Sequence, residues 1–119
     1  MSRIVFGLWA SLGLALPAQA QDGAAAGRAL YEQHCAACHS VDANRVGPAH
    51  RGVFGRRAGL APGFRYSAAL KRSSVVWDAK TLDAWLANPE RVIPGQKMYA
   101  EFDDPAVRAA IIEFLRSQK

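Results

Sequence analysis

Apolar residues recur at three- and four-residue spacing in two stretches near the ends of the chain, and this spacing predicts amphipathic helices. The first is expected from about Ala25 to His34. The last is expected from Pro105 to about Arg116, because Asp104 before Pro105 has the pattern of an N-cap followed by proline at the first helical position. Its apolar stripe consists of Val107, Ile111, Phe114 and Leu115.

Two further helices are predicted from residues that start and stop them. Ser67 is expected to cap a short helix that runs through Arg72. Asp78 is expected to cap a longer one that runs to Asn88, where Pro89 stops it. Each of these two helices therefore begins with a side chain that can accept a backbone hydrogen bond.

The segment 42–64 has a different composition, since glycine and proline recur along it without helical spacing or two-residue alternation. It is expected to be an extended loop. The glycines and prolines are Gly47, Pro48, Gly52, Gly55, Gly59, Pro62 and Gly63. The predicted fold class is therefore all-α, a single small domain of helices joined by long loops.

The N-terminus has the pattern of an export signal. Arg3 is followed by an apolar run over residues 4–16 and then by Ala18-Gln19-Ala20, a small-x-small cleavage pattern. A retained membrane anchor is the alternative, but the run is shorter than the ~20 residues that a membrane span needs. We expect residues 1–20 to be a cleaved signal peptide and residues 21–119 to be the exported domain, located in the periplasm.

The charge is modestly basic. The formal net charge of the full chain is +5, and loss of Arg3 with the signal lowers it to +4. Acidic protein partners and a merely solvated surface both fit this surplus. The chain is not expected to bind nucleic acid, because it has no basic run and no interleaving of basic and aromatic residues.

The most specific motif is Cys35-Ala36-Ala37-Cys38-His39. In an exported chain a C-x-x-C-H sequence is typical of covalent haem attachment. Two intervening residues bring both sulfurs to one side of the chain, at a separation that suits the two vinyl groups of a haem. The histidine that follows is then placed beneath the ring, where its Nε2 can reach the iron.

The cysteine pair has three other possible interpretations. A thioredoxin-like redox pair begins a helix after a strand, whereas this pair ends a helix. A zinc site needs two more ligands, and the only other histidines are His34 and His50. A disulfide between Cys35 and Cys38 closes a very small loop and contributes little stability. Haem attachment is the favoured interpretation.

The sixth iron ligand is expected to be Met98. Met1 leaves with the signal, so Met98 is the one methionine of the exported domain, and it follows a Pro-Gly turn. A lone methionine is otherwise a core filler. A thioether is a soft ligand that favours ferrous iron and raises the reduction potential. His50 is a competitor for the iron but is expected to be a polar, partly buried side chain, and His34 is expected on the exposed side of its helix.

With these motifs in view, the chain resembles the class I cytochromes c, of the mitochondrial-type branch that includes bacterial periplasmic relatives. The resemblance covers nearly all of residues 21–119. It is carried by Gly27 with Leu30-Tyr31, the Cys35–His39 motif, Gly47-Pro48, Gly52–Gly59, Ala61–Ser67, Trp77, Leu86–Pro89, Ile93–Met98 and Ile111–Leu115.

The resemblance implies specific roles. Cys35 and Cys38 would form the two thioether bonds of one haem c, and His39 and Met98 would be the axial ligands. The carbonyl of Pro48 would accept a hydrogen bond from His39 and fix its ring. Three side chains would donate hydrogen bonds to the buried haem propionates: Arg56, Tyr66 and Trp77.

The resemblance also implies how the terminal helices pack. Gly27 and Tyr31 would lie where the first helix crosses the last one. Their partners there would be Ile111 and Phe114.

Several positions depart from the family's pattern. His50 stands where a leucine is usual, Trp85 where a tyrosine is usual, and Gln96 where a threonine is usual. Leu70 replaces a polar residue, and the segment 99–104 is short and acidic. These departures leave the reduction potential and the partner surface open.

The implied function is single-electron transfer by outer-sphere reaction, without a catalytic residue. Membrane electron-transfer complexes, or periplasmic dehydrogenases and reductases, would be the donor and acceptor, and the protein is expected to be a monomer without a stable membrane anchor. The alternatives are a haem enzyme or a gas or peroxide sensor in which Met98 is labile, and a thiol oxidoreductase without haem.

Overall fold

The computed structural model describes residue 13 and residues 18–119, and most of the predicted signal peptide lies outside these residues. Within the described part of the chain there is no sheet, and the one β-type contact is an isolated bridge between Arg57 and Val76. The prediction of an all-α fold is confirmed. The helices are α1 (Ala18–His34), α2 (Ala68–Arg72), α3 (Ala79–Ala87), α4 (Pro89–Val92) and α5 (Pro105–Ser117).

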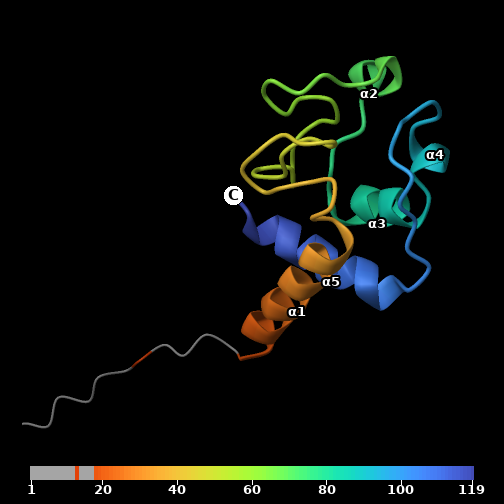
Figure 1. Ribbon diagram of the computed structural model, residues 1–119. Helices are drawn as coiled ribbons and strands as arrows, with labels where there is room; N and C mark the ends of the chain where they lie inside the picture. The colour runs from red at the N-terminus through yellow and green to blue at the C-terminus, as the bar shows by residue number, and fades with distance from the viewer. Residues whose placement is uncertain (1–12, 14–17) are drawn as a thin grey trace, which may run out of the picture.

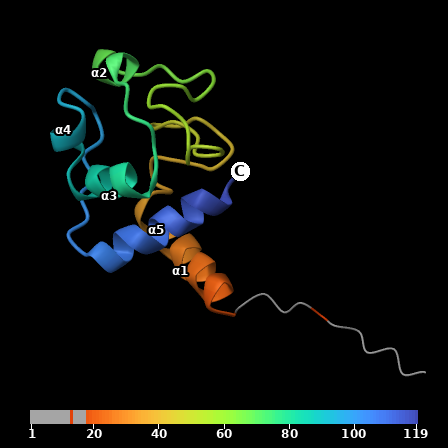
Figure 2. The same cartoon turned by 180° about the vertical axis from the view of Figure 1, so that it is seen from behind.

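Helices α1 and α5 cross each other at one end of the domain (Figures 1 and 2). Gly27 lies at the crossing, where a Cβ atom would be 2.1 Å from the carbonyl oxygen of Ala110 and 3.0 Å from the Cβ of Phe114. Only glycine permits so close an approach. The ring of Tyr31 packs 4.8 Å from that of Phe114 between centroids. The predicted crossing of the first and last helices is confirmed, although α1 begins before Ala25.

The predicted caps are present at the start of three helices. The side chain of Ser67 accepts a hydrogen bond from the backbone of α2. Asp78 and Thr81 form a reciprocal capping box at the start of α3. Asp104 accepts from the first turn of α5, with Pro105 at the first helical position. These helices begin where the sequence predicts because capping is a local interaction.

Helix α4 was not predicted, because Pro89 was interpreted only as the end of the preceding helix. Helix α3 does end at Ala87, but Pro89 then becomes the first residue of a new short helix. The side chain of Asn88 accepts a hydrogen bond from the backbone nitrogen of Arg91 and caps α4. Proline suits this first position because its missing N–H would have no partner there.

The buried core lies between α1, α3 and α5, and α5 contributes more of it than any other helix: Ile111, Ile112, Phe114 and Leu115. Helix α2 lies at the far end of the domain from the crossing of α1 and α5 (Figure 1). Two long loops, 35–67 and 93–104, complete the domain on either side of a pocket. Among the described residues, no helix has both the length and the apolar composition that a membrane crossing requires.

Candidate functional site

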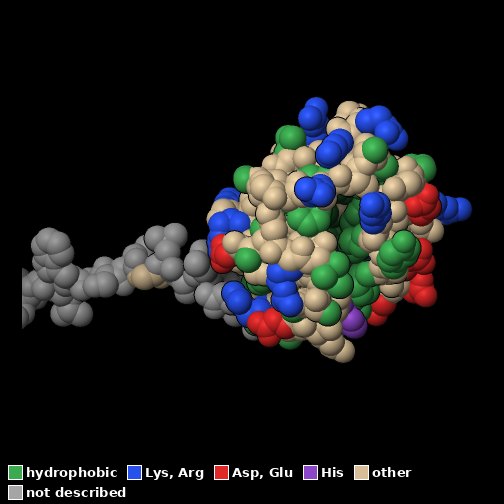
Figure 3. Space-filling view, turned by 45° about the horizontal axis from the view of Figure 1, so that its top comes forward, with side chains coloured by type: hydrophobic (Ala, Val, Ile, Leu, Met, Phe, Trp, Pro, Cys, Tyr) green, Lys and Arg blue, Asp and Glu red, His purple; other side chains and the backbone are tan. Residues whose placement is uncertain are grey.

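A cavity of about 500 Å³ lies between the loop 35–67 on one side and α3 with the loop 93–104 on the other. Figure 3 shows its mouth as a hollow lined by hydrophobic side chains, with Lys and Arg around it. Every site residue predicted from the sequence lies on its wall: Cys35, Cys38, His39, Pro48, Arg56, Tyr66, Trp77 and Met98. The rest of the wall is mainly apolar and includes Val53, Phe64, Leu70, Leu82, Trp85, Leu86, Ile111 and Leu115.

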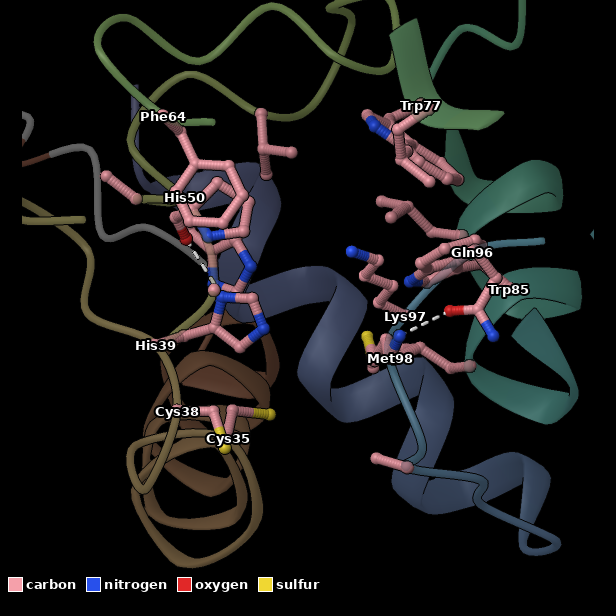
Figure 4. Close-up of a pocket in the computed structure, with 18 of the residues that line it drawn as sticks. Cys35, Cys38, His39, His50, Phe64, Trp77, Trp85, Gln96, Lys97 and Met98 are labelled. Carbon is pink, nitrogen blue, oxygen red and sulfur yellow. Dashed lines mark hydrogen bonds between the residues drawn. The ribbon is translucent and has the colours of Figure 1, made fainter. Parts of the chain in front are cut away.

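The two cysteines lie where α1 ends. The backbone nitrogen of Cys35 still donates to Tyr31 at 2.8 Å, and that of His39 donates to the carbonyl of Cys35 at 2.9 Å. The turn therefore continues from the helix and brings both thiols to the same wall as the His39 ring (Figure 4). Cys35 is half-buried, Cys38 is exposed, and both are free thiols.

The electrostatics of Cys35 do not suit a thiol oxidoreductase. Burial, with a smaller contribution from the neighbouring Cys38, raises the pKa of the Cys35 thiol to about 11. Redox-active C-x-x-C pairs depend on a lowered pKa, because the thiolate is the nucleophile. A zinc site is not supported either, since no group of three or more His, Cys, Asp or Glu side chains within the described residues could hold a metal ion.

His39 is fixed in one orientation. Its Nδ1 lies 2.8 Å from the carbonyl oxygen of Pro48. Burial lowers the pKa of His39, and the bond to Pro48 only partly opposes this effect. The ring is therefore neutral, with Nδ1–H donating to Pro48 and Nε2 left with a free lone pair. Gly47 makes room for the ring, because a Cβ at this position would lie 2.2 Å from Cε1 of His39.

Met98 lies on the opposite wall of the cavity from His39 (Figure 4). It follows a tight turn in which the nitrogen of Gln96 donates to the carbonyl of Ile93 at 3.2 Å. Gly95 in this turn has φ +89°, and with Pro94 before it the turn has the pattern of type II. The turn reverses the chain so that the half-buried Met98 side chain faces the cavity.

His50 lies on the His39 side. Its ring stacks on that of His39 with centroids 4.1 Å apart and an interplanar angle of 21°. Its Nδ1 is hydrogen-bonded to the hydroxyl of Tyr31 at 2.8 Å. Burial is the main cause that lowers the pKa of His50 to about 3, and unfavourable charge interactions with protonated His39 and with Arg56 add to it. The ring is partly buried, as the sequence predicts, but the sequence did not predict its pairing with Tyr31.

The three residues assigned to the propionates by resemblance keep hydrogen-bonding capacity. Arg56 uses one guanidinium nitrogen to donate to a loop carbonyl at 3.0 Å, and a guanidinium has five N–H groups. The hydroxyl of Tyr66 accepts from the nitrogen of Ala61 at 3.0 Å and retains its own proton for donation. Trp77 is buried, with its ring on the cavity wall.

A third histidine on the wall is His34. It is exposed, as predicted from its place on the helix. Its ring packs edge-on against Phe102 with centroids 5.4 Å apart. This contact joins the end of α1 to the loop that carries Met98.

Comparison with known proteins identifies the family to which this chain belongs. The family model described as Cytochrome c matches residues 24–119. The chain belongs to the cytochrome c family. Cytochrome c2 iso-2 of Magnetospirillum fulvum is 49% identical over 86 residues, which cover 70% of this chain and 90% of that protein. Cytochrome c2 of Rhodomicrobium vannielii is 43% identical over 96 residues, 77% of this chain and 76% of that protein.

The fold of a solved cytochrome agrees. Cytochrome cH from Methylobacterium extorquens superimposes with a TM-score of 0.75 at 42% sequence identity, over 79% of this chain and 97% of that one. The chain is thus a class I c-type cytochrome that binds one haem c covalently. The cavity suits this cofactor, since it is apolar, has two free thiols on its wall, and presents a ring nitrogen and a thioether from opposite sides.

Sequence reasoning missed one polar residue that contacts the site. Glu90 lies outside the cavity, yet its carboxylate holds the turn before Met98 through Gly95 and Gln96. The signal available was Asn88-Pro89-Glu90, which has the N-cap and proline pattern of a helix start.

Proposed function

We propose that this cytochrome c carries single electrons through a haem whose iron is ligated by His39 and Met98. The observation that carries the proposal is the placement of a neutral imidazole and a thioether on opposite walls of one apolar cavity (Figure 4). Cys35 and Cys38, beside His39, would form the two thioether bonds. The bound haem supplies the one-electron couple between ferric and ferrous iron.

The residues on the two walls favour electron transfer over substrate chemistry. Pro48 holds His39 by the bond to Nδ1, which orients Nε2 and increases its basicity as a ligand. Met98 offers a soft, neutral sulfur that stabilises the ferrous state. With both side chains bound, neither face of the iron would be open to oxygen or peroxide. The apolar wall excludes water and adds to the preference for the less charged ferrous state.

Arg56, Tyr66 and Trp77 are proposed to hold the haem propionates. Support comes from their shared place on the cavity wall and from the donors that they retain. A carboxylate removed from water needs hydrogen bonds or a paired charge. The Arg56 guanidinium offers both, and the other two residues add neutral donors.

We propose export to the periplasm with cleavage after Ala20, on the strength of the charged start, the apolar run and the A-x-A pattern. The donor and acceptor would be membrane electron-transfer complexes or periplasmic dehydrogenases and reductases. Lysine and arginine side chains around the mouth of the pocket would attract acidic surfaces of such partners (Figure 3). The protein would work as a diffusing monomer.

The proposal is tested by carbon monoxide and a potentiometric titration of the exported holoprotein. The titration is expected to follow a reversible one-electron curve, and carbon monoxide is expected to leave the ferrous spectrum of the parent unchanged. Met98→Ala opens the sixth position and is expected to bind carbon monoxide. Rapid binding by the parent would contradict the carrier function and favour a sensor or enzyme with a labile methionine.

A further inference from the structure

The carboxylate of Glu90 holds the turn that precedes Met98. Its Oε1 accepts a hydrogen bond from the backbone nitrogen of Gly95 at 2.8 Å. Its Oε2 accepts from the side-chain nitrogen of Gln96 at 3.3 Å. One side chain on α4 therefore binds two consecutive residues of the turn.

Gln96 passes this connection on to Met98. The side-chain oxygen of Gln96 accepts a hydrogen bond from the backbone nitrogen of Met98, and Figure 4 shows this bond beside the cavity. The two ends of the Gln96 amide thus make different bonds, the nitrogen with Glu90 and the oxygen with Met98. A threonine, which is usual in the family at this position, is too short to bridge the two.

The short helix α4, which carries Glu90, is itself held in place. Glu90 is the second residue of α4, directly after Pro89, which is fully buried. Asn88 caps the helix by accepting from the nitrogen of Arg91 at 3.1 Å. The nitrogen of Ile93 donates to the carbonyl of Pro89 at 3.0 Å and closes the same short helix. Glu90 therefore projects from a capped, hydrogen-bonded turn that is anchored by a buried proline.

We propose that Glu90 and Gln96 are positioning residues for Met98, and that they keep its sulfur in place against displacement by external ligands. This inference rests on the proposed function, in which Met98 is the axial ligand. A ligand from a loop is lost when the loop moves away, so bonds present only in the closed loop lower the population of the open form. Glu90 lies outside the cavity wall and Gln96 lies on it, and the role proposed for both acts through the backbone that carries Met98.

Substitutions of Glu90 and Gln96 break different hydrogen bonds. Glu90→Gln keeps one oxygen that can accept from Gly95, but its amide nitrogen then faces the amide nitrogen of Gln96, and two donors cannot pair. Glu90→Ala removes both bonds at once. Gln96→Ala removes the acceptor of the Met98 nitrogen and leaves the bond between Glu90 and Gly95 in place. The three variants therefore break only the bond of Glu90 to Gln96, both bonds of Glu90, or the bonds of Gln96.

Glu101 provides a matched control for charge. It is an exposed glutamate on the loop 93–104 that carries Met98, and it is not part of the cavity wall. Within the described residues the Glu101 side chain makes no hydrogen bond. Glu101→Ala thus removes one negative charge from the same loop without breaking the connection to Met98.

The experiment is a titration of the ferric holoproteins with imidazole, which must displace Met98 to bind the iron. The parent, Glu90→Ala, Glu90→Gln, Gln96→Ala, Glu101→Ala and Met98→Ala are compared by affinity and by limiting binding rate. Glu90→Ala and Gln96→Ala are expected to bind imidazole roughly two- to tenfold more tightly and faster, the range for loss of one hydrogen bond. Glu90→Gln is expected to fall between the parent and Glu90→Ala, because it loses only the bond to Gln96, and Glu101→Ala is expected to match the parent.

The free energy of unfolding in guanidinium is measured in parallel, because a purely structural role would change it without changing the rate of imidazole binding at 25 °C. If Met98→Ala binds tightly while Glu90→Ala and Gln96→Ala match the parent, the positioning role is wrong and the proposed ligation stands. A Glu90→Ala effect no larger than that of Glu101→Ala would also overturn the role. If Met98→Ala itself matches the parent, Met98 is not the ligand, and both proposals fail.

Discussion

The hydroxyl of Tyr31 is hydrogen-bonded to Nδ1 of His50 at 2.8 Å, inside the wall that carries His39. The ring of His50 in turn stacks on that of His39. A polar pair thus replaces apolar packing next to the proposed iron ligand. Tyr31 is 4% exposed, and burial is the main cause that raises its pKa, so its hydroxyl stays protonated. The Tyr31–His50 pair is expected to affect both the size of the free energy of unfolding and its dependence on pH.

The first prediction concerns acid stability. The pKa of His50 in the folded protein is about 3, below its ordinary value of 6.5. Between these two values the unfolded chain binds a proton that the folded protein does not, so the free energy of unfolding falls as the pH falls. The contribution of one such group is at most ~1.4 kcal/mol per pH unit. His50→Leu is expected to flatten the dependence by up to that amount.

The measurement is urea unfolding of the parent and His50→Leu at a series of pH values between 6.5 and about 4. Both measurements use the holoprotein, in which the proposed bond from His39 to the iron would keep that ring from titrating, so the difference reports His50. Equal slopes for the two proteins would show that the burial of His50 does not govern this dependence.

The second prediction tests the pairing itself. Tyr31→Phe leaves Nδ1 of His50 buried without its partner, which is expected to cost about 1–3 kcal/mol in the free energy of unfolding. The same change in a His50→Leu background removes no bond and is expected to cost clearly less. A double-mutant cycle with guanidinium unfolding measures the coupling. Additive effects would mean that Tyr31 acts by ring packing alone.

The third prediction concerns the space beneath His39. A Cβ at Gly47 would lie 2.2 Å from Cε1 and 2.6 Å from Nδ1 of His39, so Gly47→Ala must move the ring. The ring would then lose its bond to Pro48 or its place in the cavity. We expect a holoprotein with an altered ferric spectrum and a weakened bond between His39 and the iron. Gly55→Ala is the control for a loop glycine, because no atom lies within 4 Å of its added Cβ.

Gly55 has φ +89°, so its substitution adds backbone strain without touching His39. Stability is therefore expected to fall in both variants, and the ferric spectrum to change only in Gly47→Ala. Identical spectra for Gly47→Ala and the parent would contradict the geometry described for His39.

The fourth prediction concerns the charge at the mouth of the pocket. Lys97 is exposed and lies on the cavity wall next to Met98. Lys97→Glu is expected to slow oxidation of the ferrous protein by ferricyanide, an anion, by roughly two- to tenfold at low salt. The difference is expected to shrink as the ionic strength rises, because the Debye length falls to ~10 Å at 0.1 M.

Lys80→Glu is the matched control, since Lys80 is exposed on α3 and is not part of the cavity wall. It makes the same change in net charge at a different place. Equal slowing by the two variants would mean that net charge, and not the charge at the mouth, governs the encounter. Visible spectra are expected to remain those of the parent in both.

The parts of the fold that were predicted from the sequence depend on neighbouring residues. Ser67, Asp78 and Asp104 each accept a hydrogen bond from a backbone nitrogen two or three residues later. Their local patterns were therefore sufficient to place the starts of α2, α3 and α5. The crossing at Gly27 was implied by family resemblance, and the close approach to Ala110 supplies its physical reason. Helix α4 was missed because a proline can end one helix and begin another.

The contacts within the site were harder to predict. Tyr31 and His50 are 19 residues apart, and their pairing depends on how the loop after α1 returns to it. The bonds of Gln96 depend on the turn at Gly95 and on the unpredicted helix that carries Glu90. His50 and Gln96 were visible in the sequence as departures from the family's pattern. Their partners, Tyr31 and Glu90, were set by the tertiary structure.

The most direct test of the proposed ligation is the visible spectrum of the exported holoprotein, first oxidised and then reduced. Ligation by His39 and Met98 predicts a weak far-red band in the ferric protein, which disappears in Met98→Ala, and sharp α and β bands on reduction. A high-spin ferric spectrum, or a far-red band that persists in Met98→Ala, would contradict the account.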